Sequence, residues 1–275
     1  MKKTRRAKPI LIISAILTVI LVITAVVILR VKPNVDKIIS GLYRAIIVSP
    51  MKSETHGSIT YYYENEGNFN EGMKFWYDSV VPEAHSIGEQ YFGAIDSKKP
   101  DIVIFPDEKT KKTYHNINNV AAWYLGEENS IYLDHETIGV TTFVHEYIHY
   151  ITYAFCQENN ISFEDIPAWF IEGIAEYISM MPGGYDPNSF TLEGFVAFEE
   201  INELTEFQNL VDKGLNPYIQ SYAAIHKLIE LKGQEAITRI ILRTKDVDFY
   251  TAFEEEVGMP FQEFQSLVEG LLSSN

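Results

Sequence analysis

The sequence predicts an α+β protein in which an N-terminal transmembrane helix precedes a small β-rich lobe and a helical lobe. Three observations lead to this fold class. Residues 9–29 contain no charged residue. Runs rich in β-branched and aromatic residues, typical of strands, recur up to residue 134, and runs with helical periodicity follow from residue 138 onward. Strands and helices segregated in this way are typical of α+β domains, which can form a cleft where the two lobes meet.

The composition of the 275-residue chain is that of a globular protein, with 46% hydrophobic and 22% charged residues. It excludes a disordered chain and a disulfide framework. The formal net charge of −16 argues against nucleic acid as a partner, because proteins bind this polyanion through Lys and Arg. Cys156 is the only cysteine, so the chain has no intrachain disulfide, and we expect it to be a small buried residue rather than a nucleophile.

The uncharged run is long enough to cross a membrane as one helix. Its 21 residues span roughly 31 Å at about 1.5 Å per residue, which matches a hydrocarbon core of about 30 Å. A cleaved signal peptide is the alternative, but its apolar core is shorter and ends in small residues. Five cations precede the run, and Arg30 and Lys32 follow it, so the positive-inside rule places the N-terminus in the cytoplasm and the later residues outside the cell membrane.

This interpretation divides the chain into four parts: a basic cytoplasmic tail at 1–8, a transmembrane anchor at 9–30, a juxtamembrane stalk at 31–54 and a globular domain at 55–275. In the stalk, residues 34–48 are mildly amphipathic and predict a helix that ends at Ser49-Pro50.

The β-rich lobe is expected to contain four strands and two helices. Its strands follow β-branched and aromatic runs, and a turn sequence between the last two predicts a hairpin. The expected strands are 58–64, 101–105, 121–125 and 130–134, and the expected helices are 67–92 and 106–114.

The helical lobe is expected to contain five helices, because apolar residues recur there at helical spacing. Pro182-Gly183-Gly184 ends the second of them. The expected helices are 138–156, 164–180, 216–232, 234–243 and 260–272.

The first of these helices contains the sequence HEYIH at residues 145–149. Residues four apart lie on one face of a helix, so His145 and His149 can bind one metal ion while Glu146 lies beside its open side. This geometry suits zinc. A catalytic zinc also needs a third protein ligand and leaves its fourth position to water.

The second helix offers the third ligand. Pro167 lies at its start, and Glu172 and Glu176 lie one turn apart on one face. Carboxylates are costly to bury in an apolar helix unless they have partners, which a metal and its histidines would supply. We expect Glu172 to bind the metal, Glu176 to accept the free N–H of a ligand histidine, and Gly173 to let the two helices approach closely. The alternative is that both are solvated surface carboxylates.

These two segments, HEYIH and PAWFIEGIAEY, resemble the gluzincin metallopeptidases, in particular the peptidase MA-like group and, more distantly, the aminopeptidase N and thermolysin families. The resemblance implies a thermolysin-like zincin fold with the active site between its lobes. It implies one Zn²⁺ ion held by His145, His149 and Glu172, with Glu146 as the catalytic base. The gap between the two segments is a few residues longer than in aminopeptidase N.

A further segment, residues 218–233, is similar to the part of aminopeptidase N that opens with a transition-state tyrosine. By that resemblance Tyr218 is the oxyanion donor. Tyr222 and His226, one and two turns further on, are the alternatives, because thermolysin-like enzymes use a histidine for this task. A buried tyrosine that serves helix packing is the competing explanation for Tyr218.

The resemblance implies a membrane-anchored zinc peptidase acting on a peptide or protein substrate. We expect an endopeptidase, because the glycine-rich sequence that binds the substrate amine in aminopeptidase N is absent and Glu127 and Glu128 are expected in the hairpin turn. A strand near 120–124 or 130–134 is expected to bind the extended substrate along its edge. The alternative is a membrane-anchored binding module that keeps the fold without catalysis. The sequence indicates no oligomeric state.

Overall fold

The computed structural model describes residues 41–42, 44–65, 67, 69–114, 121–135, 138–180 and 194–273. The chain divides into two units, Met1–Pro50 and Met51–Asn275. In the first unit, the described residues between 41 and 48 are helical and a turn follows at Ser49-Pro50, as expected. The rest of that helix and the expected membrane span at 9–30 lie outside the described residues. Among the helices that are described, none has the length and hydropathy needed to cross a bilayer.

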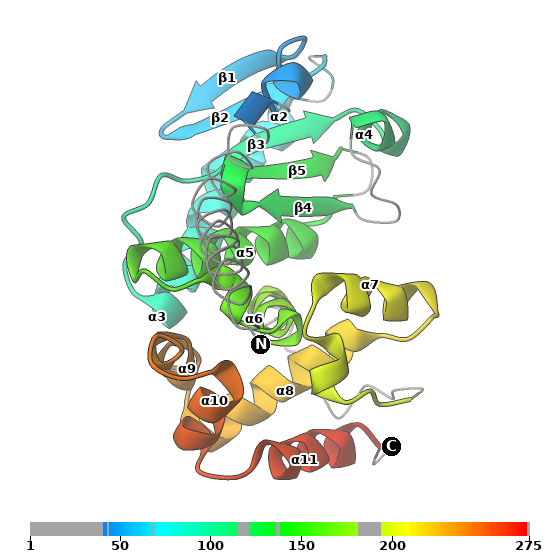
Figure 1. Cartoon of the computed structure of the whole chain (residues 1–275). Coiled ribbons are helices and arrows are strands. Elements are labelled where there is room, and N and C mark those ends of the chain that lie inside the picture. The colour runs from blue at the N-terminus through cyan, green and yellow to red at the C-terminus, as the bar shows by residue number, and fades with distance from the viewer. Residues whose placement is uncertain are drawn as a thin grey trace, which may run out of the picture. The chain divides into compact units, whose positions relative to one another are not determined.

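The second unit contains a five-stranded mixed sheet with the strand order β1-β2-β3-β5-β4 (Figure 1). The three inner strands run parallel to one another, and each edge strand is antiparallel to its neighbour. The strands are β1 Lys52–His56, β2 Ile59–Tyr63, β3 Asp101–Phe105, β4 Ala122–Leu125 and β5 Ser130–Asp134. β1 lies in the segment that the sequence assigned to the stalk and the first domain residues. Its residues are almost all exposed, so it lacks the apolar alternation that marks a strand.

The predicted hairpin is confirmed as β4 and β5, which pair in antiparallel with Tyr124 opposite Ile131. A 3-10 turn at Gly126–Glu128 joins them, and Asn129 follows in the left-handed region with φ 45°. Because β5 also pairs with β3, β4 is the free edge of the sheet on this side.

In Figure 1, α3 and α5 lie nearest beneath the sheet, and α6, α8 and the C-terminal helices follow below them, whereas α2 lies beside β1 and β2 and α4 at the end of β3. All five helices expected in the helical lobe are confirmed, with their ends moved by a few residues. The helices are α2 Glu71–Phe75, α3 Val81–Phe92, α4 Glu108–Tyr114, α5 Val140–Glu158, α6 Ala168–Met180, α7 Leu204–Asp212, α8 Pro217–Lys232, α9 Ala236–Arg243, α10 Phe249–Val257 and α11 Phe261–Ser273, with short 3-10 turns at Phe163–Asp165 and Phe198–Ile201.

The helix expected at 67–92 begins later and is not uniform. Asn70 caps it, since its side chain accepts from the N–H groups of Gly72 and Met73, and α2 therefore starts at Glu71. A π-helical turn at Trp76–Val80 joins α2 to α3. Pro82 is the second residue of α3, directly after this π-helical turn.

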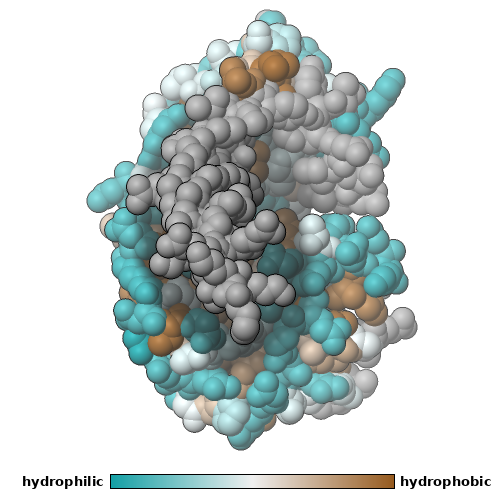
Figure 2. All heavy atoms as spheres, in the orientation of Figure 1, coloured by the Kyte–Doolittle hydropathy of each residue, from teal (hydrophilic) through white to brown (hydrophobic). Residues whose placement is uncertain are grey.

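One hydrophobic core extends through the second unit, from Ile59 on β2 to Leu272 on α11. Cys156 on α5 is fully buried in it, as expected, and burial raises the pKa of its thiol to about 12. On the face shown in Figure 2, hydrophobic atoms form separate brown spots among hydrophilic residues rather than one patch. Exposed large apolar side chains of this unit come from different elements, for example Phe75, Leu204, Leu242 and Leu267.

Candidate metal centre

The two histidines of the HEYIH segment and Glu172 come together between α5 and α6. Both imidazoles lie on one face of α5, and their Nε2 atoms are 3.0 Å apart. Glu172 on α6 faces them, with its Oε2 atom 3.1 Å from Nε2 of His145 and 3.4 Å from Nε2 of His149. The three donor atoms thus converge on one point, and all three side chains are nearly buried.

The geometry of these donors fits a zinc ion. Donor atoms about 2.0–2.1 Å from a tetrahedral zinc lie roughly 3.3 Å from one another. The three separations here are 3.0, 3.1 and 3.4 Å. Two imidazole nitrogens with one carboxylate oxygen form a donor set that zinc prefers, and three protein ligands leave one position open. The arrangement therefore suits a catalytic rather than a structural zinc site.

Glu176 lies one turn after Glu172 on the same face of α6 and contacts the ring of His145. The Nδ1–H group of His145 donates to its Oε2 atom at 3.0 Å. This bond orients the ring so that the other nitrogen faces Glu172, which is the arrangement that ligand histidines commonly need. The structure thus brings Glu176 to the position that the sequence predicted for it.

The electrostatics of the cluster favour a positive charge at its centre. Burial alone would raise the pKa of Glu172, but the charge of His149 and hydrogen bonds from both imidazoles hold that pKa well below its usual range. Burial disfavours a charged His145, yet hydrogen bonds to Glu172 and Glu176 outweigh it and raise the pKa of His145 well above its usual value. In the protein without a metal, His145 therefore carries a proton, and a metal ion would compete with that proton for the imidazole nitrogen.

Glu146 is anchored by the edge of the sheet. It is 8% exposed, and its Oε2 atom accepts a hydrogen bond of 2.8 Å from the main-chain N–H of Tyr124 on β4. Burial raises the pKa of Glu146, while the charges of His149 and His145 oppose that rise. The sequence did not reveal this contact. A main-chain donor leaves no mark in residue type, and only the position of the predicted hairpin pointed toward it.

Tyr218, the first of the three oxyanion candidates, borders the cluster of His145, His149 and Glu172. It lies in the first turn of α8, and its ring centroid is 6.1 Å from that of His145 in an edge-to-face arrangement. Burial raises the pKa of its phenol, and the carboxylates of Glu172, Glu146 and Glu176 raise it further.

The two alternatives to Tyr218 lie along α8 against another residue. Tyr222 and His226 pack around Tyr177 of α6, with ring centroids 5.6 Å and 6.1 Å from it. The geometry therefore brings the ring of Tyr218 against a metal-ligand candidate, His145, and the rings of Tyr222 and His226 against Tyr177.

Gly173 allows a close helix contact, but not the one expected. A Cβ atom built on it would lie 2.6 Å from the carbonyl oxygen of Ser221 and 2.9 Å from Cγ1 of Ile225, both on α8. The prediction that this glycine serves the contact between α5 and α6 is therefore wrong. Gly173 follows Glu172 directly, and successive helical residues are turned by about 100° about the axis, so the glycine meets α8 while Glu172 faces α5.

Comparisons with known proteins find a distant relative and solved structures with a coarse likeness to the chain. No family model matches it. It is 24% identical over 240 residues to the uncharacterized protein YhcO of Bacillus subtilis (strain 168), a match that covers 82% of this chain and 73% of YhcO.

Two of the solved structures that resemble the chain are M1 zinc metallopeptidases. One is from Deinococcus radiodurans, with a TM-score of 0.47 and 12% identity over 81% of this chain and 50% of that chain. The other is a two-domain mutant bound to L-arginine, with a TM-score of 0.47 and 11% identity over 81% of this chain and 51% of that chain. The chain spans about half the length of these solved chains. At such identities and TM-scores the likeness is coarse, so the chemistry of this chain must follow from its own residues.

Proposed function

We propose that this chain is a zinc-dependent peptidase of the gluzincin type, with a zincin fold and one Zn²⁺ ion held by His145, His149 and Glu172. The observation that carries the proposal is the convergence of three buried donor atoms, 3.0 to 3.4 Å apart, beside a buried glutamate that is not needed as a ligand. A structural zinc site would be closed by a fourth protein ligand. An open position next to a carboxylate suits hydrolysis instead.

The side chains around the open position have distinct roles. A bound zinc would polarise the scissile carbonyl and lower the pKa of a water molecule. Glu146 accepts the proton of the attacking water and delivers it to the leaving amine. The Tyr218 phenol donates a hydrogen bond to the oxyanion as it forms. Glu176 keeps the His145 ring oriented, and the Tyr124 N–H keeps the Glu146 carboxylate directed toward the same space.

The substrate is proposed to be an extended peptide bound along the free edge of β4. This edge adjoins α5, and its residue Tyr124 already contacts Glu146. An edge strand offers main-chain hydrogen bonds to any extended chain, which supports cleavage within a peptide. The two glutamates of the hairpin turn give no support to an amine-binding site, since Glu128 accepts a hydrogen bond from Tyr132 and Glu127 is exposed.

We further propose that residues 9–30 anchor the protein in the cell membrane, with residues 1–8 in the cytoplasm and the peptidase unit outside. The asymmetry of cations about the apolar run supports this orientation. A peptide or protein on the outer side of the membrane would then be the substrate.

The test combines metal analysis with digestion of a peptide library by the full-length chain. We expect one zinc per chain, cleavage within peptides, and loss of cleavage on treatment with a chelator that returns when zinc is added. Glu146→Gln is expected to keep zinc while cleavage falls by at least about 10²-fold, because the proton acceptor is gone. Glu127→Gln, in the exposed turn, is the matched control and should retain full activity.

Three results would contradict the proposal. A chain without tightly bound zinc would remove its basis. A chain that binds zinc and cleaves no member of the library would favour the alternative of a membrane-anchored binding module. Cleavage by Glu146→Gln at the wild-type rate would show that another group acts as the base.

A further inference from the structure

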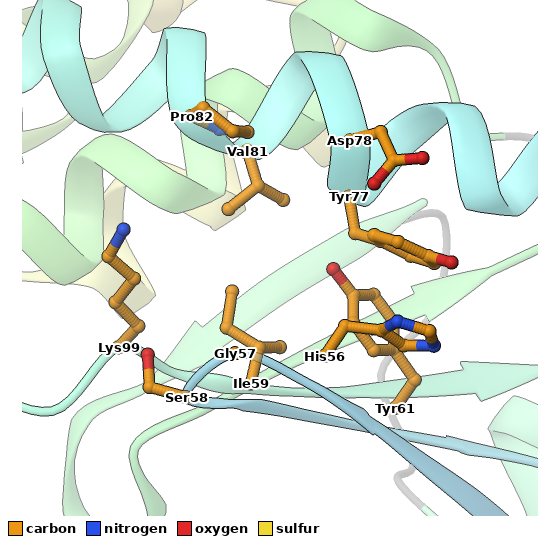
Figure 3. A pocket seen from close by; sticks show the side chains of 10 residues that line it. All are labelled: His56, Gly57, Ser58, Ile59, Tyr61, Tyr77, Asp78, Val81, Pro82 and Lys99. Atoms are coloured by element: carbon orange, nitrogen blue, oxygen red, sulfur yellow. The ribbon is translucent and has the colours of Figure 1, made fainter.

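A pocket of about 410 Å³ lies near the edge of the sheet opposite β4. It is formed between the β1–β2 turn and the junction of the π-helical turn with α3. Its volume falls in the range of small-molecule sites, roughly 300 to 1,000 Å³. None of its lining residues belongs to the candidate metal centre, whose side chains come from α5, α6 and α8. Figure 3 shows the ten side chains that line it.

The hydroxyl group of Tyr61 points into this pocket without a partner. Tyr61 is 1% exposed, and within the described part of the chain its hydroxyl has no hydrogen-bond partner. In Figure 3 the oxygen is directed toward the space between Ile59, Val81 and Tyr77. A buried hydroxyl without a hydrogen bond costs free energy, so a ligand with a polar atom at this point would be stabilised.

Two side chains of opposite charge lie on opposite sides of the pocket in Figure 3: the Lys99 ammonium on one and the Asp78 carboxylate on the other. Among the residues that the structure describes, neither has a salt-bridge partner, although many charged residues of this chain are paired. A ligand that carries both a negative and a positive group could pair with each of them.

The wall on the Asp78 side of the pocket is aromatic in Figure 3, and Ile59 and Val81 lie between it and Lys99. The His56 ring stacks on Tyr77 with centroids 3.8 Å apart and an angle of 19° between planes. The Tyr61 ring lies 5.2 Å from that of Tyr77. Flat rings of this kind bind apolar side chains and peptide planes.

We propose that this pocket binds a short zwitterionic peptide. Its terminal carboxylate pairs with Lys99, its terminal ammonium with Asp78, and a polar main-chain atom bonds to the Tyr61 hydroxyl. The aromatic wall contacts the remainder of the peptide. The site is separate from the metal centre and does not depend on the proposed peptidase activity.

The experiment is isothermal titration calorimetry of the full-length chain carrying Glu146→Gln, so that the probes stay intact. The probes are the dipeptide Ala-Leu, its C-terminal amide, its N-acetyl derivative and free leucine. We expect saturable binding of Ala-Leu in the presence and in the absence of a chelator. Loss of either terminal charge should weaken binding by about tenfold or more.

Three substitutions assign the contacts, each added to this chain. Lys99→Met should bind Ala-Leu and its amide equally, and Asp78→Asn should bind Ala-Leu and its N-acetyl derivative equally. Tyr61→Phe should weaken binding several-fold without lowering the melting temperature, because it removes a hydroxyl that has no partner in the free protein. Lys98→Met is the matched control, since Lys98 pairs with Asp101 and does not line the pocket, and it should bind like the parent chain.

Several results would overturn the proposal. Absence of saturable binding, equal affinity for Ala-Leu and both blocked dipeptides, or the same effect of Lys99→Met and Lys98→Met would each exclude a zwitterion site here. Leucine that binds as tightly as Ala-Leu would exclude a peptide as the ligand. Binding that is lost with the chelator would place the dipeptide at the metal centre instead.

Discussion

Burial and three nearby carboxylates raise the pKa of the Tyr218 phenol above its ordinary value, so the phenol keeps its proton beyond the pH at which a free tyrosine loses it. A protonated phenol beside the metal ligands can donate a hydrogen bond to a developing oxyanion. We predict that Tyr218→Phe lowers kcat by about 10²- to 10³-fold with a small change in KM, because the bond forms in the transition state. Steady-state kinetics on a cleaved peptide, with zinc content measured in parallel, would test this prediction.

The matched control for Tyr218 is Tyr222, one turn further along α8. Tyr222 packs against Tyr177, so Tyr222→Phe should leave kcat near the wild-type value. If the effects of the two substitutions were reversed, the oxyanion donor would be Tyr222 and the packing explanation for Tyr218 would hold.

In the proposed site, Glu176 would act through His145 rather than on the substrate. Its Oε2 atom accepts the Nδ1–H group of that ring at 3.0 Å. We predict that Glu176→Ala weakens zinc binding by about 10- to 100-fold, and that Glu176→Gln has a smaller effect because its amide oxygen can still accept the bond. Competition with a chromophoric chelator measures both affinities. Equal losses for the two variants would show that charge, rather than orientation of the ring, is what matters.

At the scale of elements, the contact between α6 and α8 depends on the missing side chain of Gly173. A Cβ atom there would lie 2.6 Å from a main-chain oxygen of Ser221, which cannot move without shifting α8. We predict that Gly173→Ala lowers the free energy of unfolding by about 1–3 kcal/mol. Urea unfolding followed by circular dichroism would measure it.

Gly270 provides the control, because it lies inside α11 and a Cβ atom there would meet nothing within 4 Å. Alanine is the better helix former, so Gly270→Ala should raise the free energy of unfolding by about 0.5–1 kcal/mol. If both substitutions stabilised the protein, the close approach at Gly173 would be of no energetic importance.

Elements with long periodic patterns could be predicted from the sequence, and short or exposed elements could not. The hairpin and the helices that carry His145 and Glu172 have the apolar spacing of buried elements, and the i to i+4 rule placed both histidines on one face. β1 was missed because its residues are almost all exposed. α7 and α10, with nine residues each, were also missed, although the shorter α9 was expected.

The parts of the site that the sequence could not supply are those made by main-chain atoms or by long-range packing. The hydrogen bond from the Tyr124 N–H to Glu146 depends on where β4 lies relative to α5. The contact of Gly173 with α8, rather than α5, depends on which face of α6 each neighbour covers. Neither relation is encoded in the local pattern of residue types.

For the whole molecule, a metal held by α5 and α6 would link two layers of the fold. A ligand that binds only the folded state stabilises it by about 2.7 kcal/mol when its concentration is 100 times its dissociation constant. We predict that a chelator lowers the melting temperature of the wild-type chain by several degrees and that zinc restores it. Differential scanning calorimetry would measure the shift. Glu172→Gln should show little response to either reagent, and an equal response would place the stabilising ion elsewhere.

The buried thiol of Cys156 can report how often the core around it opens. Cys156 lies seven residues beyond His149 on α5, and with a pKa of about 12 only about one thiol in ten thousand is ionised at pH 8. An alkylating reagent can therefore reach the thiol of Cys156 only when the surrounding core opens locally. We predict that labelling, followed by mass spectrometry, is slow in the zinc-loaded chain and faster after chelation. Equal rates would mean that departure of the ion leaves α5 as firmly packed as before.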